Sequence, residues 1–429
     1  MSPHPPGRSR QVAVLVFLIF IAISLLTNIL GPIIPDVIQG FSLSLSAAAL
    51  LPFSFFIAYG VMSIPAGLLV ERHGEKPVIL GAFALSLTGS LLISCVPGYS
   101  TALVSVFLIG VAMAVLQVAI NPLLRVAGGE EHFAFNCALA QLLFGGASFV
   151  SPQVYAYLVA ALQPRAPKAG PLALLAAVTP ARWPWISLYW LFAVLSVAML
   201  LLVALFRFPT VERTGEETVG SWRLTSRLFG NRIVLLYFVS IFAYVGSEQG
   251  TANWISEFLS AYHRADPHTT GAMEVAWFWG LLTIGCALGL ALLKLLDSRR
   301  VLIGASLGAM AALTAALYGN TAIALLAFPA IGFFASVMWP VIMSLALNSL
   351  PHSHGAFAGI LCTAIIGGAI VPLWIGQIGD HFGLRAGLLL LYVTFCWILG
   401  VGFWARPLVQ NQTIGHRKAM QPGADPHLY

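Results

Sequence analysis

The chain has 429 residues, of which 59% are hydrophobic and only 8% are charged, and its mean hydropathy is +0.90. Soluble domains usually carry about 25% charged residues, so this composition excludes a soluble protein and predicts an integral membrane protein. The net charge of +6 does not indicate a nucleic-acid partner, because the basic residues lie in loops and termini, where the lipid bilayer accounts for them.

Twelve apolar runs are long enough to cross a bilayer as helices of about 20 residues. The first follows Arg8 and Arg10, but it is too long for the core of a signal peptide and no small-residue cleavage site closes it. We therefore interpret it as a spanning helix in an all-α membrane protein. The predicted spans are residues 11–34, 47–70, 77–96, 99–124, 133–161, 184–207, 232–260, 271–293, 301–318, 321–349, 355–378 and 385–405.

A single long polar connection divides these spans into two groups of six. It predicts an N-terminal half at 1–208, a cytoplasmic linker at 209–231, a C-terminal half at 232–406 and a cytoplasmic tail at 407–429. The halves resemble diverged copies, because Gly145-Gly146-Ala147 recurs as Gly367-Gly368-Ala369, 222 residues later. The stretches that begin at Gly67 and Gly289 have the same separation. Repeats of this size are typical of transporters that move one half against the other around a site at the bilayer midplane.

Orientation follows from the distribution of Lys and Arg. With both termini in the cytoplasm, sixteen of the 21 basic side chains lie on the cytoplasmic side and five on the other. The excess on one side predicts a multi-pass protein of the cytoplasmic (inner) membrane with both termini inside.

The stretch from Gly110 to Gln153 places many polar groups within apolar runs. Polar side chains and prolines inside hydrocarbon are unfavourable unless they face other helices or a water-filled path. The stretch therefore predicts either a site for a polar solute or amide contacts that join helices. The residues concerned are Gln117, Asn121, Asn136, Gln141 and Gln153, with Pro122 and Pro152 predicted to break the helices.

The loop GLLVERHGEKP, Gly67 to Pro77, resembles the loop 2–3 motif of the major facilitator superfamily. Glu71 replaces the usual Asp of that motif, whereas Arg72 and Lys76 occupy their expected positions. A carboxylate and a cation at a helix end can pair with each other and with a neighbouring helix terminus. We therefore predict a conformational gate at Glu71, Arg72 and Lys76. The resemblance implies a fold of two pseudo-symmetric six-helix halves.

Within that superfamily, four stretches resemble the fucose:proton symporter family of fucose, galactose and glucose permeases. They are LQVAINP from Leu116 with the following HFAFNCALAQLLFGGA, YVGSEQGTANWISEFL from Tyr244, SVMWPVIMSLALNSL from Ser336, and IIGGAIVPLWIGQIGD. The resemblance covers most of the chain and implies a secondary carrier of a hexose-like sugar, driven by H⁺ or, as a second choice, Na⁺.

Two departures from that family affect the coupling ion. The family's Asp of the first span falls near Gly31, and its Glu of the fourth span falls on Gln117, which cannot release a proton. Asp36 is five residues further on, near the end of its span. Glu248 is the one acidic residue deep in a predicted span, where a charge is unfavourable by ~2.5–3.5 kcal/mol on insertion scales. We therefore predict that Glu248 couples transport to the ion; the alternative is a structural hydrogen bond between helices.

Sugar recognition requires groups that hydrogen-bond hydroxyls and aromatic faces that cover the ring. The spans named by the resemblance supply both. Tryptophan is also common at membrane interfaces and in helix packing, which is the alternative for each ring. The predicted substrate-binding residues are Gln117, Asn121, Asn136, Gln141, Gln249, Asn253, Trp254, Trp277 and Trp339.

No nucleotide-binding loop or hydrolase motif is present, and the five cysteines occur singly within apolar runs. We therefore expect no enzyme activity, no cofactor, no metal and no nucleic-acid partner, and a monomer in the bilayer. The alternatives to a coupled sugar carrier are an uncoupled sugar uniporter and an exporter of drugs or amphipathic metabolites. A further alternative is a nutrient receptor or structural protein that keeps the fold without transport.

Overall fold

The computed structural model describes residues 6–128, 133–163, 169–206, 208, 228–350 and 354–406. Every regular element in these ranges is a helix. Twelve segments are long and apolar enough to cross a membrane. The prediction of an all-α membrane fold with twelve spans is therefore confirmed.

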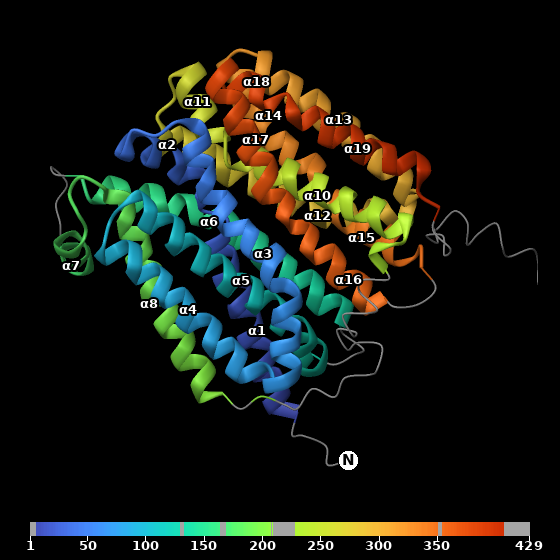
Figure 1. The fold of residues 1–429 in the computed structure, drawn as a ribbon, viewed down its shortest axis with the longest axis horizontal. Helices are drawn as coiled ribbons and strands as arrows, with labels where there is room; N and C mark the ends of the chain where they lie inside the picture. The colour runs from blue at the N-terminus through green and yellow to red at the C-terminus, as the bar shows by residue number, and fades with distance from the viewer. Residues whose placement is uncertain are drawn as a thin grey trace, which may run out of the picture.

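Residues before 208 form the first group of helices, blue to green in Figure 1. They are α1 (Pro6–Thr27), α2 (Leu30–Phe41), α3 (Leu45–His73), α4 (Glu75–Cys95), α5 (Tyr99–Gly128), α6 (Phe133–Ala161), α7 (Pro171–Val178), η2 (Pro184–Ile186) and α8 (Ser187–Leu205).

Residues after 228 form the second group, yellow to red. They are α10 (Arg232–Ala252), α11 (Ile255–His263), η3 (Pro267–Gly271), α12 (Ala272–Leu295), α13 (Ser298–Tyr318), α14 (Thr321–Ala335), α15 (Met338–Leu347), α16 (His354–Thr363), η4 (Ala364–Ile366), α17 (Gly367–Phe382), α18 (Leu384–Leu388) and α19 (Leu390–Trp404).

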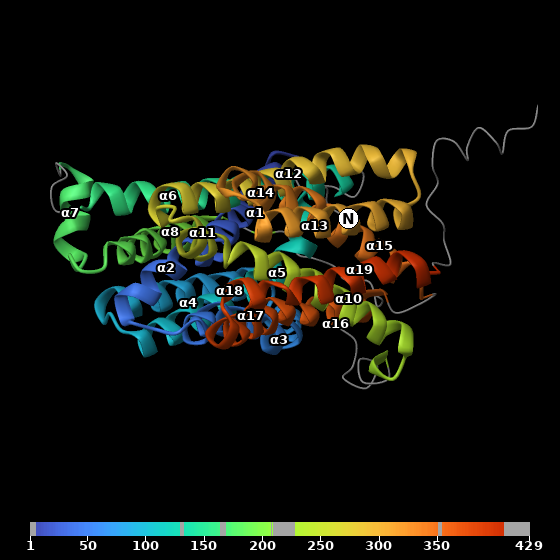
Figure 2. The same ribbon diagram turned by 90° about the horizontal axis from the view of Figure 1, so that it is seen from above.

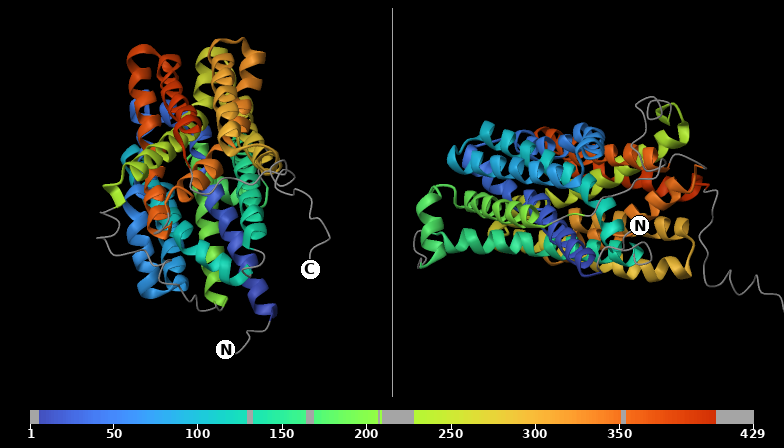
Figure 3. Two further views of the ribbon diagram at one scale, coloured as in Figure 1. Left: turned by 90° about the vertical axis from the view of Figure 1, so that its right-hand side faces the viewer. Right: turned by 90° about the horizontal axis from the view of Figure 1, so that it is seen from below.

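Each group has a hydrophobic core of its own. One cluster of buried side chains runs from Val12 to Val203, with two additions from the second group. The other runs from Val234 to Ala405, with three additions from the first group. In the left view of Figure 3 the blue and green helices lie mainly below the orange and red ones. We refer to the two groups as the first and second halves. The exact boundaries stay a prediction, since residues 209–227 of the linker and the whole tail lie outside the described residues.

Two differences between the observed helices and the expected spans concern the first span and the prolines. The first span continues through Pro35 to Phe41 and therefore takes Asp36 into helix α2. The expectation that Pro122 and Pro152 break their helices is wrong, because α5 and α6 run through both positions. A proline removes only one hydrogen bond of a long helix, and neighbouring helices in a bundle can satisfy the freed carbonyl group.

The internal repeat is visible in the packing. A Cβ atom on Gly110 of α5 would overlap with the carbonyl oxygen of Phe55 in α3. A Cβ atom on Gly332 of α14 would overlap with the carbonyl oxygen of Phe278 in α12. These glycines are 222 residues apart, as are the two Gly-Gly-Ala motifs. Each half therefore brings two of its helices together in the same way, through a glycine that admits a backbone of the neighbouring helix.

The two halves meet mainly where α3 contacts α17 and where α6 contacts α12. The Gly-Gly-Ala motifs lie at these two contacts. Gly145 of α6 packs against Thr283 of α12, and a Cβ on Gly368 of α17 would lie 3.1 Å from the ring of Phe56 in α3. The motifs that indicated a repeat therefore also form the close approach between the halves.

The ends of the bundle are distinguished by the chain termini. The start of α1 and the end of α19 mark one end of the bundle, and we call the opposite end the distal face. It carries α2, α11 and α18 (Figure 1), and α7 lies beyond the ends of α6 and α8 (Figure 2). Large apolar side chains on the spanning helices point outward, including Leu205 at 79% exposure and Leu326 at 76%. Such exposure is expected of a surface in contact with lipid.

Candidate functional site

Glu248 lies in the C-terminal part of α10, four residues before its last residue, and is half-buried. The hydroxyl group of Tyr244, one turn earlier, donates a hydrogen bond of 2.7 Å to its Oε1. The ring of Trp339 in α15 lies 5.8 Å from the ring of Tyr244. The structure therefore brings two of the predicted residues, Glu248 and Trp339, into one group around Tyr244, which is not among the predicted substrate-binding residues.

Two amides that follow Glu248, one on α10 and one at its C-terminal cap, are more deeply buried. Gln249 is 4% exposed and lies against Gly368, close to Phe56 of the other half. Asn253 is 2% exposed, and its Nδ2 has no hydrogen-bond partner among the described residues. A buried donor without a partner is unfavourable by about 1–3 kcal/mol. The Nδ2 group of Asn253, one of the predicted contacts, is therefore available to donate a hydrogen bond to a ligand or a water molecule.

Gly31 packs directly against this part of α10. A Cβ atom there would overlap with the carbonyl oxygen of Ala252 and would lie 3.2 Å from the Cα of Asn253. An aspartate at position 31 therefore does not fit between the halves in this conformation. This contact gives a physical reason why the first span carries glycine here.

Two of the predicted tryptophans lie elsewhere. Trp254 is completely buried, and its Nε1 donates to the carbonyl oxygen of Pro372 at 3.3 Å within the second half. Trp277 is 43% exposed and packs edge-on against Phe149 of the first half, with the ring centroids 5.3 Å apart. Neither ring is joined to Glu248 in this conformation, so their roles as sugar platforms stay predictions.

The predicted amides of the first half are spread over α5 and α6. Gln117 and Asn136 are half-buried and Gln141 is exposed, whereas the side chain of Asn121 lies outside what the structure describes. In the described part of the chain, no hydrogen bond joins Gln117 or Gln141 to Glu248. Gln153 donates to the carbonyl oxygen of Phe149 in its own helix at 3.0 Å, which fits a structural role.

A cluster of polar side chains that are not among the predicted site residues lies deeper in the first half. Asn28, at the break between α1 and α2, donates to Ser148 Oγ at 2.7 Å. Ser24 also bonds Ser148 at 2.7 Å, and Ser151 donates to the carbonyl oxygen of Leu25 at 3.0 Å. These bonds join α1 to α6. Asn28 is only 4% exposed, and its place in a long apolar run was the signal that could have identified it.

At the end opposite the distal face, the predicted gate residues follow one another around the α3–α4 connection. The Nζ of Lys76 donates to the carbonyl oxygens of Ala204 and Phe206 at 2.8 and 2.7 Å. These carbonyl groups form the C-terminal end of α8, where a cation is favourable. Glu71 and Arg72 are exposed. The contact of Lys76 lies within the first half, and the gating role of all three residues stays a prediction.

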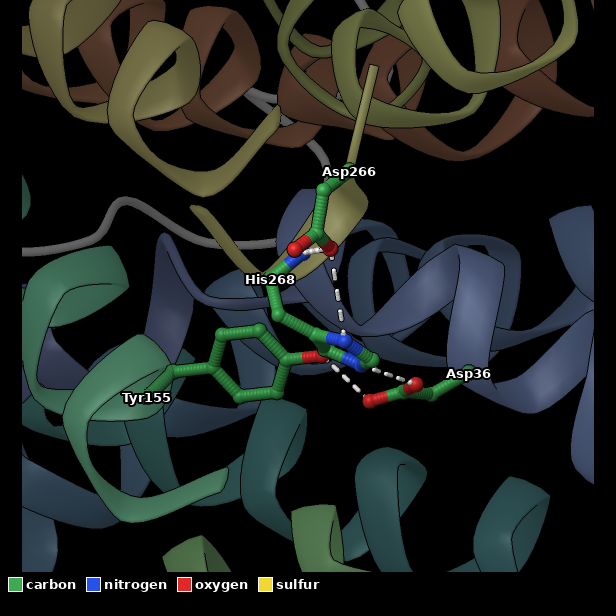
Figure 4. Close-up of polar contacts among 4 residues, drawn as sticks. All are labelled: Asp36, Tyr155, Asp266 and His268. Atoms are coloured by element: carbon green, nitrogen blue, oxygen red, sulfur yellow. Dashed lines mark hydrogen bonds and ion pairs between the residues drawn. The ribbon is translucent and has the colours of Figure 1, made fainter. Parts of the chain in front are cut away.

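The distal face contains a polar cluster that sequence reasoning missed (Figure 4). Asp36 of α2 accepts a hydrogen bond from the hydroxyl of Tyr155 in α6 and lies 2.7 Å from Nε2 of His268 in η3. Asp36 and Tyr155 belong to the first half and His268 to the second. Tyr155 is fully buried, and the side chains of Asp36 and His268 are 12% and 31% exposed. The cluster therefore joins the halves through a largely buried contact.

A second polar contact between the halves lies on the same face. Asp380, near the end of α17, accepts hydrogen bonds from the backbone N–H groups of Leu45 and Ser46 at 2.7 and 3.0 Å. These are the first N–H groups of α3, so a carboxylate of one half caps a helix of the other. Leu45 and Asp380 are separated by 335 positions, so no local pattern of the sequence indicates that Asp380 caps a helix of the opposite half.

Comparison with known proteins settles the family. The family model for the Major Facilitator Superfamily matches residues 16–372. This chain belongs to the Major Facilitator Superfamily. Its members are transporters, so the prediction that the chain is a membrane transporter and not an enzyme is confirmed.

Individual relatives within the superfamily extend over nearly the whole chain. A glucose/galactose transporter of Brucella abortus is 30% identical over 397 residues, covering 90% of this chain and 92% of the relative. An L-fucose-proton symporter of Escherichia coli is 26% identical over 403 residues, covering 88% and 89%. The crystal structure of the transporter FucP in the outward conformation superposes with a TM-score of 0.66 at 22% identity, covering 92% of this chain and 98% of that one. The resemblance inferred from the motifs is therefore confirmed.

Proposed function

We propose that the protein carries a hexose-like sugar of the glucose, galactose or fucose class across the cytoplasmic membrane by alternating access. The observation that carries the proposal is the group of Glu248, Tyr244 and Trp339, formed by the C-terminal part of α10 and the first turn of α15. A carboxylate and a hydroxyl can bond sugar hydroxyl groups, while an indole can cover the apolar face of the ring. The names of the Brucella and E. coli relatives support the same substrate class.

The proposed carrier is monomeric and takes up H⁺ together with the sugar, with Na⁺ as the second choice. Both termini lie in the cytoplasm, so the distal face opens to the outside. Glu248 is the proposed coupling group, because it is an acidic side chain within a spanning helix and is half-buried. The buried amides Gln249 on the same helix and Asn253 at its C-terminal cap are proposed as further sugar contacts, together with Gln117, Asn121 and Gln141 of the first half.

Uptake of labelled glucose, galactose and fucose into proteoliposomes tests this proposal. Accumulation driven by an imposed pH gradient is expected for the wild type, and Glu248→Gln is expected to reduce accumulation by more than about tenfold. The double variant Glu248→Gln with Gln249→Glu moves the carboxylate to the adjacent buried position and tests whether a carboxylate anywhere on this turn suffices.

The outcomes separate the possible carriers. Equilibration without accumulation under a pH or Na⁺ gradient would indicate a uniporter, the alternative that Gly31 and Gln117 leave open. Unchanged ion dependence in Glu248→Gln would exclude Glu248 from coupling. No flux of any of the three sugars would refute the substrate class.

A further inference from the structure

The ring of His268 lies between two carboxylates. Its Nε2 lies 2.7 Å from Oδ1 of Asp36 in the first half. Its Nδ1 lies 3.6 Å from Oδ1 of Asp266, two residues earlier in the chain. Figure 4 shows the ring between these two groups, with the phenol of Tyr155 bonded to Asp36. Both nitrogens of one imidazole therefore face acceptors.

This geometry favours one protonation state. A neutral imidazole has one N–H group and one lone pair, so either tautomer would direct a lone pair at a carboxylate, whereas the imidazolium ion has an N–H group on both nitrogens. Asp36 faces the Tyr155 hydroxyl through Oδ2 and His268 through Oδ1, which fits an ionised carboxylate that accepts on both oxygens. The contact between the halves is therefore complete when His268 carries an extra proton.

The neighbouring elements supply no other partner for the ring. The elements packed against η3 are α2, α6, α11 and α12. Besides Asp36 and Tyr155, they carry Tyr157 on α6, Glu257, Tyr262 and His263 on α11, and Glu274 on α12. Within the described residues, no hydrogen bond or ion pair joins any of these five to His268. The two aspartates thus dominate the electrostatic surroundings of the ring.

We propose that Asp36, His268 and Asp266 form a proton-binding latch, so that closing the distal face binds one proton on His268 and opening it releases that proton. The inference rests on the proposed alternating access, because only a protein that separates its halves at the distal face breaks the Asp36–His268 contact. Because the closed state binds the extra proton, acidification on the distal side favours the closed state, and a rise in pH through the histidine range favours opening. The latch is separate from Glu248 and acts on the conformation of the carrier.

The test is a distance measurement between the halves by spin labelling. The full-length protein, with its native cysteines replaced by serine, carries Val96→Cys at the end of α4 and Ala261→Cys on α11, both exposed positions. Distances are recorded in lipid nanodiscs without sugar at about pH 5.5 and about pH 8, which bracket the ordinary histidine pKa of about 6.5. The ratio of closed to open protein is expected to fall as the pH rises, by at most about tenfold per unit, because one proton is linked.

Three variants identify the group responsible. His268→Gln is expected to abolish the pH dependence and to increase the open fraction. Tyr155→Phe removes one bond to Asp36 but leaves the charges, so it should increase the open fraction and keep the pH dependence. His263→Gln is the matched control, because this second histidine of the distal face bonds Thr321 within its own half at 3.1 Å. It should behave as the parent protein.

Two results would overturn the latch: distances in the parent protein that do not change with pH, or a pH dependence that survives in His268→Gln. If His268→Gln does not fold, Asp36→Asn and Asp266→Asn test the same pair of carboxylates and should each reduce the pH dependence. The measurement contains no sugar, so failure of hexose uptake would not affect it. Conversely, distances that are independent of pH would leave hexose transport untouched.

Discussion

Charged groups at the two ends of the bundle cap helices in different ways. At the distal face, Asp380 caps the start of α3 from the opposite half, and Asp36 meets His268 across the same boundary. At the other end, Lys76 caps the end of α8 within the first half. A contact within a half persists when the halves move, whereas a contact between halves must break and re-form. The former therefore contributes to folding stability, and the latter sets the balance between conformations.

The largest effect is expected from two glycines that admit a neighbouring backbone, one between the halves and one within a half. Gly31→Val would place its side chain against Ala252 of the other half and hold the distal face open. We expect uptake to fall more than about tenfold, since 1.4 kcal/mol against closure already changes the population by that factor. Gly110→Val would clash with Phe55 inside the first half and lower the folding stability by ~1–3 kcal/mol or more.

Transport assays and thermal unfolding on both variants distinguish these effects. Gly31→Val should unfold at nearly the wild-type temperature and should show the open distance between labels at positions 96 and 261. A comparable loss of thermal stability in both variants would mean that the contact between the halves is part of the folded core and does not act as a hinge surface.

An intermediate effect is expected from the two charged caps. Asp380→Asn keeps a hydrogen-bond acceptor but removes a charge from a helix N-terminus, which is worth ~0.5–1 kcal/mol and should lower the closed-to-open ratio about two- to fivefold. Lys76→Met should instead lower the unfolding temperature and leave that ratio unchanged. The same spin-label pair, with a thermal unfolding curve for each variant, checks both. A shift of the ratio in Lys76→Met would place Lys76 in the gate that the loop motif predicts.

The smallest effect is expected at His263, which lies outside the spanning segments. Burial, and then the nearby positive charge of Arg385, lower the pKa of His263 below its usual value. The stability from its neutral form is therefore present above the unfolded pKa of about 6.5 and is lost as the pH falls through the lower folded value. Relative to wild type, His263→Gln should be more stable at about pH 5 than at about pH 8, by about 1–2 °C in unfolding temperature. The opposite order would show that the histidine is stabilised in its charged form.

The sequence was sufficient for the architecture because the architecture depends on local properties. Apolar length defines the twelve spans, and the loop from Gly67 to Pro77 is a contiguous motif of the superfamily. Glu248 could be chosen because an acidic residue within a spanning run is conspicuous by itself. The position of Lys76 beside a helix terminus also followed from the motif.

The distal cluster could not be predicted in the same way. Asp36 and His268 are separated by 232 residues, and Asp36 and Tyr155 by 119. No periodicity connects them, and Asp36 looked like the end of a span because Pro35 precedes it. His268 looked like a loop residue, since the π-helical turn at Pro267–Gly271 is short and polar. Likewise, the sequence around Trp254 does not tell whether its ring faces the substrate path or the interior of the second half. Only the packing reveals that it is buried in the second half.

The cap that Asp380 places on α3 has a consequence for hydration. In the closed form the N–H groups of Leu45 and Ser46 bond this carboxylate, while that of Ala47 bonds Ser44 of the same turn. When the halves separate, Leu45 and Ser46 need new acceptors, and water is the available one. Opening of the distal face is then linked to water uptake at a helix terminus. Osmolytes that are excluded from protein surfaces would shift the carrier toward the closed form, so its conformational balance depends on water activity as well as on solutes.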